Sequence, residues 1–157
     1  MPVTATIANQ ILRKAEEVNE LYYRLVLVVS PPDKGNGAVF KKLAEQKGLR
    51  LVNVNLELSE QMLTMTARQR ALGAASLLGD IVANGNHETV LLDNIEIVFD
   101  PVLRLDPLRV LQSLSRRQTI VASWKGWVQG TYLTYAEPDH PEYRRYSTEE
   151  LVLIHQD

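Results

Sequence analysis

The sequence contains no cysteine, which excludes disulfide bonds, cysteine-ligated metal sites and thiol catalysis. Long apolar runs are also missing: the longest, Leu25–Val29, is far too short to cross a membrane. The first ten residues show no basic segment followed by an apolar one, so the pattern does not predict a signal peptide. These absences together favour a cytoplasmic protein without a membrane partner.

Positive charge is not in excess either. The net charge of −2 at pH 7 lacks the basic balance that is typical of sequence-independent nucleic-acid binding. Apolar residues make up 45% of the 157 residues and charged residues 23%, which is ordinary for a chain with one hydrophobic core. No repeat or linker divides the sequence, so we predict a single domain over residues 1–157.

Hydrophobic periodicity predicts alternating helices and strands. Helices are expected over residues 4–22, 38–47 and 66–83, and a further helix should begin at Asp106–Pro107. Short apolar runs predict strands at 24–30, 51–56, 89–93, 119–124 and 150–156, with a hairpin around Gln129–Gly130. This order predicts an α/β fold with helices on a mainly parallel sheet, and the segments 25–29, 89–93 and 119–123 should be its central strands.

The segment after the first strand has the length and setting of a P-loop. A P-loop has the pattern Gly-x4-Gly-Lys-Ser/Thr: its backbone amides hold phosphate, its lysine neutralises charge and its hydroxyl helps to bind Mg²⁺. In the best register Ser30 and Gly35 take the two glycine positions, Asn36 replaces the lysine and Gly37 replaces the hydroxyl residue. Lys34 is a displaced lysine nearby. The alternative is an ordinary turn between a strand and a helix.

Two other strand ends are polar. Asp93 follows the three apolar residues Val90, Leu91 and Leu92, as in a Walker B strand, and is the candidate Mg²⁺ ligand. The next residue, where many ATPases carry a catalytic glutamate, is Asn94, whose amide cannot accept a proton from water. Glu96 is the candidate substitute if the chain turns it inward, and Ser123 is a candidate contact to the γ-phosphate. Strands without any ligand also often end in aspartate.

These positions make up one candidate site, because ligands of open α/β sheets bind beyond the carboxyl ends of the strands. Asp93 and Glu96 are the candidate catalytic residues. The candidate nucleotide-binding residues are Ser30, Pro31, Pro32, Asp33, Lys34, Gly35, Asn36, Gly37 and Ser123.

Outside this site, arginines surround the helical segment 105–117, which could contact protein, nucleotide or DNA. They are Arg104, Arg109, Arg116 and Arg117. A solvated helix face is the simpler interpretation of such a charge pattern. The three histidines, His87, His140 and His155, lack the spacing of metal ligands.

The sequence resembles the BrxF family, the small P-loop-containing proteins of bacteriophage exclusion (BREX) systems. The resemblance covers about residues 25 to 146. It rests on the segments LVNVNLELS (51–59), LLDNIEIVFDP (91–101), LDPLRVLQSLSRRQTIVASW (105–124) and YLTYAEPDHPEYRRY (132–146). It implies a three-layer P-loop NTPase-like fold without a lid domain and a role in phage defence beside the system's larger proteins. It also implies a loop of the GPPGSGKT kind, which Pro31, Pro32 and Gly35 match and from which Ser30, Asn36 and Gly37 depart.

We therefore expect a degenerate P-loop subunit that acts by association with itself or with larger BREX proteins. ATP with Mg²⁺ is the cofactor that the loop suggests, and we expect its binding to be weak and its hydrolysis undetectable. Two alternatives are an active ATPase or nucleotide switch that uses Lys34 and Asp93, and a DNA-contacting accessory protein that uses the arginine-rich helix.

Overall fold

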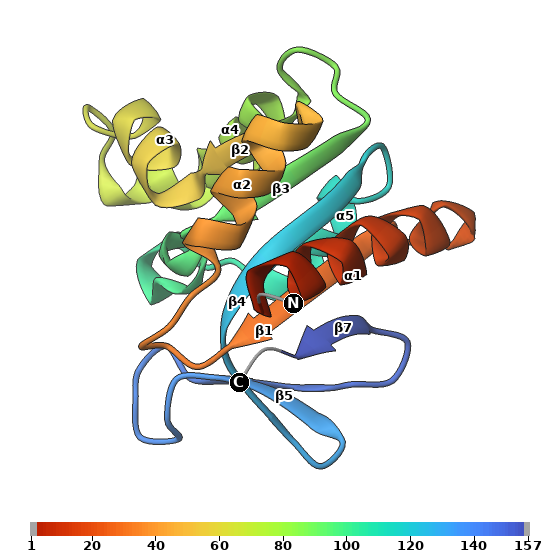
Figure 1. The fold of residues 1–157 in the computed structure, drawn as a ribbon. Helices are drawn as coiled ribbons and strands as arrows, with labels where there is room; N and C mark the ends of the chain where they lie inside the picture. The colour runs from red at the N-terminus through yellow and green to blue at the C-terminus, as the bar shows by residue number, and fades with distance from the viewer. Residues whose placement is uncertain (1–2, 156–157) are drawn as a thin grey trace.

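The computed structural model describes residues 3–155, and it is an α/β protein with a mostly parallel central sheet (Figure 1). The parallel part has the strand order β2-β3-β4-β1-β7. Its strands are β1 (Leu25–Ser30), β2 (Arg50–Asn53), β3 (Thr89–Asp93), β4 (Thr119–Gln129) and β7 (Val152–His155). The prediction that segments 25–29, 89–93 and 119–123 form central strands is confirmed, because β3, β4 and β1 lie between β2 and β7.

Helices cover both faces of this sheet. They are α1 (Val3–Glu17), α2 (Gly37–Lys47), α3 (Val54–Gln61), α4 (Ala67–Ala83) and α5 (Pro107–Leu114). On one face, Ile11 of α1 and Phe40 of α2 pack with Val26 and Val121 of the sheet. On the other, α3, α4 and α5 pack against alternate residues of the same strands, such as Leu27. Strands buried on both faces explain why their sequences are nearly continuous apolar runs.

Two predicted helix starts are confirmed by their caps. Thr66 and Gln69 form a capping box at the start of α4, in which each side chain accepts a hydrogen bond from the other's backbone N–H. Asp106 accepts the N–H of Arg109 at the start of α5. These local hydrogen bonds satisfy amides that a helix leaves unpaired at its first turn.

Two boundaries early in the chain differ from the prediction. The second strand ends at Asn53 instead of residue 56, because the Asn53 side chain accepts the N–H of Leu56 and so begins α3. The first helix ends at Glu17 and continues as a 3-10 turn, η1 (Val18–Glu20). In α4 the buried line is Ala74, Leu78 and Val82, and Leu72 is 78% exposed.

The fourth strand does not end at Trp124. β4 runs on to Gln129 and turns into an antiparallel pair with β5 (Tyr132–Tyr135), which confirms the predicted hairpin. β5 then pairs with β6 (Arg144–Ser147), an antiparallel strand that the sequence analysis missed. Two further 3-10 turns, η2 (Glu96–Phe99) and η3 (Pro101–Leu103), join β3 to α5.

An aromatic cluster attaches this antiparallel extension to the main domain. Tyr135 stacks on Phe99 of η2, and Trp124 contacts both rings edge to face. The Tyr146 hydroxyl donates to Asp106 Oδ1 at 2.8 Å. Burial raises the pKa of Tyr135 and of Tyr146 above the usual value for tyrosine, and for Tyr146 the hydrogen bond to Asp106 adds to the effect. Within residues 3–155, no helix combines the length and apolarity needed to span a membrane.

Candidate phosphate-loop site

The fold brings most of the predicted site residues to one edge of the sheet. β4 lies between β1 and β3, so the loop after β1, the end of β3 and the middle of β4 are neighbours. Ser123 of β4 and Asp93 of β3 both lie next to the loop that leads into α2. The predicted juxtaposition of loop, aspartate and serine is therefore present in the structure.

Asn36, at the position of the P-loop lysine, points into the protein. Its side chain is 2% exposed, and its Nδ2 group donates to Val28 O and to Ser123 Oγ, both at 2.9 Å, with Ser30 Oγ at 3.4 Å. Ser30 and Ser123 are themselves buried. The amide therefore joins the loop to β1 and β4, where a P-loop lysine would extend along the loop towards phosphate. Its Oδ1 atom is buried and has no hydrogen-bond partner.

The loop itself closes as a tight turn. The N–H groups of Lys34 and Gly35 both donate to Pro31 O, at 3.0 and 3.4 Å, and Gly35 has a φ of +70° that favours glycine. These two amides are thus satisfied inside the turn, whereas a P-loop directs its amides at phosphate. The side chains of Asp33 and Lys34 are exposed, so Lys34 lies outside the buried part of the site.

Asp93 lies against the first residue of α2. A Cβ atom placed on Gly37 would be 3.5 Å from Asp93 Oδ2, and the other carboxylate oxygen accepts the N–H of Asn94 at 2.9 Å. Asn36, the N-cap of α2, makes no side-chain capping hydrogen bond. A carboxylate is stabilising near a helix N-terminus, so Asp93 supplies there the negative charge that a bound phosphate would otherwise bring.

Glu96 does turn towards the site, where it meets a lysine that the sequence analysis missed. Lys125 Nζ lies 2.8 Å from Glu96 Oε1, and both side chains are about a quarter exposed, at 27% and 28%. Lys125 also lies close to the loop, since a Cβ on Gly35 would be 3.3 Å from Lys125 Cε. The available signal was spacing: Lys125 is two residues after Ser123 and so lies on the same side of β4.

The residues present do not fit Mg-ATP. Three carboxylates, those of Asp33, Asp93 and Glu96, surround the loop, against the two lysines Lys34 and Lys125. This net negative charge would repel a polyphosphate. Two of the loop amides that could bind it already donate to Pro31 O. Gly37, aligned with the hydroxyl residue of a P-loop, offers no side-chain ligand for Mg²⁺. Lys125 and two of the loop amides are thus already engaged within the protein.

Comparison of the chain with protein-family models, curated proteins and solved structures found no match.

Proposed function

We propose that this protein is a degenerate P-loop subunit of a bacterial phage-exclusion system, which acts by association and not by nucleotide hydrolysis. The observation that carries the proposal is the Asn36 side chain. It stands in the lysine position, is buried, and is hydrogen-bonded to Val28 and Ser123 of the sheet. A side chain held in this way fixes the loop to the sheet without a ligand.

The arrangement of strands supports descent from a P-loop ATPase. In many such enzymes the strand before the phosphate loop and the strand ending in the Mg²⁺-binding aspartate lie on either side of a third strand with a polar residue near its end. Here β1 and β3 flank β4, Asp93 ends β3, and Ser123 lies on β4 beside the loop. An ordinary turn between a strand and a helix would not require these three features together.

The replaced residues remove what nucleotide binding needs. A charge-assisted lysine contact contributes about 1.5–3 kcal/mol net, so its loss alone weakens binding roughly ten- to a hundredfold. Gly37 removes a Mg²⁺ ligand, and Asn94 cannot act as a general base. Lys125 offers a positive charge near Gly35, but Glu96 already pairs with it.

Association is the remaining mode of action. The domain has helices directly on its sheet and, within residues 3–155, no additional helical unit that would close over the loop. The resemblance to the BrxF family supplies the biological setting, a phage-exclusion system whose larger proteins carry out the chemistry.

A phage-plating assay with site variants tests the proposal. In a strain that carries the complete exclusion system, deletion of this gene should abolish protection, and the wild-type gene should restore it. An Asp93→Asn variant should restore it equally, because the proposal gives Asp93 no catalytic role. The matched biochemical measurement is titration of the purified protein with a fluorescent ATP analogue and Mg²⁺, which should not saturate. Protection lost in a folded Asp93→Asn variant, together with saturable binding, would refute the proposal.

A further inference from the structure

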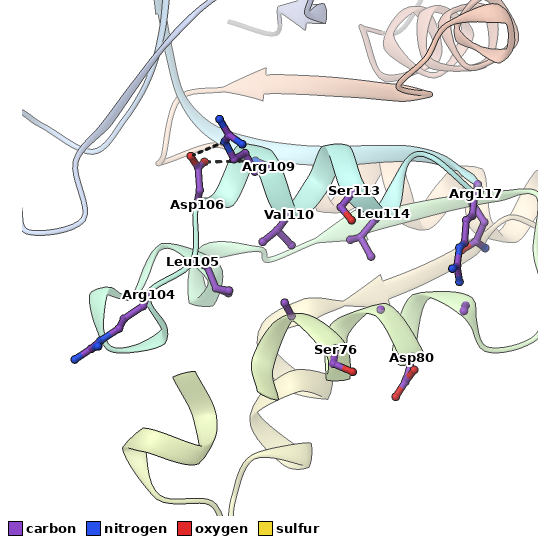
Figure 2. Close-up of a pocket in the computed structure, with 14 residues that line it drawn as sticks. Ser76, Asp80, Arg104, Leu105, Asp106, Arg109, Val110, Ser113, Leu114 and Arg117 are labelled. Atoms are coloured by element: carbon purple, nitrogen blue, oxygen red, sulfur yellow. Dashed lines mark hydrogen bonds and ion pairs between the residues drawn. The ribbon is translucent and has the colours of Figure 1, made fainter. Parts of the chain in front are cut away.

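A groove of about 600 Å³ lies between α4 and the segment that leads into and through α5 (Figure 2). We call it the α4–α5 groove. On the α4 side it is lined by the small residues Ala75 and Gly79, and from α5 the side chains of Val110 and Leu114 project towards α4. Small residues let a second backbone approach closely, so the groove has the shape and the apolar surface to receive a further helix.

Arginines line the same groove. Arg104, Arg109 and Arg117 belong to its lining and are exposed. Arg109 lies 3.7 Å from Asp106, whereas among the residues described Arg104 and Arg117 form no ion pair. The lining thus holds three arginines against the two carboxylates of Asp80 and Asp106, in a chain whose net charge is −2.

The backbone at Arg104 strengthens the case for a role of its side chain. Arg104 has a φ of +53°, in the left-handed region, where glycine or asparagine costs less than arginine. The residue ends η3 by donating its N–H to Pro101 O. This backbone conformation costs free energy in the free protein. Such conformations cluster at functional sites, which supports a binding role for the Arg104 side chain.

We propose that the α4–α5 groove binds an acidic amphipathic helix of a larger partner protein. This inference rests on the proposed function, in which the protein acts by association. From Ala75 to Ala83 the lining of α4 extends about 12 Å, which matches about two helical turns. The apolar face of the bound helix would cover Val110 and Leu114, and carboxylates near its two ends would meet Arg104 and Arg117.

Two other occupants fit less well. A nucleic-acid phosphate backbone has no apolar surface with which to cover Val110 and Leu114. A second copy bound through the same face by twofold symmetry would bring like arginines together. A separate partner helix with an apolar face and carboxylates near its two ends avoids both conflicts.

The experiment is co-purification of the tagged protein with the larger proteins of the exclusion system, expressed together. Gly79→Gln fills the groove from within, and it should fold normally because nothing lies within 4 Å of a Cβ at Gly79. Arg104→Glu with Arg117→Glu reverses the charge of the rim. The matched control is Lys41→Glu with Lys47→Glu, an equal charge change on exposed residues of α2, across the sheet. Circular dichroism verifies the fold of each variant.

We expect both groove variants to reduce recovery of a partner at least about tenfold, while the α2 control matches wild type. Equal recovery with folded groove variants would overturn the groove proposal and leave association intact. No recovery with the wild-type protein would instead refute the proposed function. Two further results would overturn the inference. The wild-type protein could self-associate in light scattering, or bind a labelled DNA duplex, and both groove variants could lose that property.

Discussion

The side-chain amide of Asn36 donates a hydrogen bond to Ser123 Oγ at 2.9 Å and thereby joins the loop after β1 to the adjacent strand β4. The same nitrogen donates to Val28 O, and both side chains are buried. The P-loop register proposed from the sequence places Asn36 where a lysine would stand. The structure instead gives it a structural role, which makes separate predictions about stability and about nucleotide binding.

The first prediction is that Asn36 and Ser123 stabilise the fold jointly. Asn36→Ala should lower the free energy of unfolding by about 2–3 kcal/mol, because it removes the buried hydrogen bonds to Val28 O, Ser30 Oγ and Ser123 Oγ. Ser123→Ala should cost about 1 kcal/mol, and a double-mutant cycle should give a coupling of about 1 kcal/mol.

Urea denaturation measures the free energy of unfolding of the wild type, the two single variants and the double variant. Asp33→Ala, on an exposed residue of the same loop, is the control and should change stability little; a coupling near zero would contradict this role.

A second prediction concerns stability in alkali. Burial raises the pKa of Tyr135 and Tyr146 in the folded protein above the usual value for tyrosine. Their contribution to stability is therefore complete below about pH 10, where the unfolded chain also keeps both protons. It is lost as the pH rises above that value, because the unfolded state then releases protons that the folded state retains.

The measurement is the free energy of unfolding between pH 8 and pH 11 for wild type and for the Tyr135→Phe, Tyr146→Phe double variant. We expect the wild-type value to fall above about pH 10 and the variant's value to fall less steeply. The variant should also be less stable at neutral pH, since the Tyr146 hydroxyl no longer donates to Asp106. Equal slopes for the two proteins would show that these tyrosines do not control alkaline unfolding.

The third prediction tests the junction between the parallel sheet and the antiparallel extension. A Cβ on Gly126 would lie 2.1 Å from Thr134 O and 2.9 Å from Trp124 Nε1, so β5 must move if alanine is placed there. Gly126→Ala should cost about 3 kcal/mol or more and lower the melting temperature accordingly. Gly79→Ala is the matched control. Nothing lies within 4 Å of its Cβ, and in the helix α4 alanine should stabilise by about 0.5–1 kcal/mol.

Much of the fold was predictable because its signals are local. Valine and leucine runs identify β1 and β3, since strands buried on both faces have no polar positions, and the caps at Thr66 and Asp106 fix two helix starts. β6 was missed because its sequence, RRYS, has no apolar alternation: it is held by pairing with β5 and by the contact of Tyr146 with Asp106.

The candidate site was predictable in its positions and not in its contacts. The order of the strands placed Ser123, in the middle of β4, and Asp93, at the end of β3, beside the loop. The inward direction of Asn36 and the pairing of Lys125 with Glu96 depend on packing between segments distant in the sequence, which periodicity does not describe.

The last prediction concerns restoration of a nucleotide site by Asn36→Lys with Gly37→Thr. Gly37 is exposed, and a Cβ there would lie 3.5 Å from Asp93 Oδ2, so a threonine fits and brings a hydroxyl beside the carboxylate that would share Mg²⁺. Lysine at position 36 is too long for the buried site of the amide and must extend along the loop, where it can neutralise phosphate. The double variant should therefore bind Mg-ATP at least about tenfold more tightly than wild type in a fluorescent-analogue titration.

The double variant should also be less stable than wild type, because the hydrogen bonds of Asn36 are lost. Adding Asp93→Ala to the double variant should abolish the gain, and Gly37→Thr alone should produce little of it. If a folded double variant binds no more tightly than wild type, residues 30–37 are an ordinary turn and the P-loop assignment is wrong.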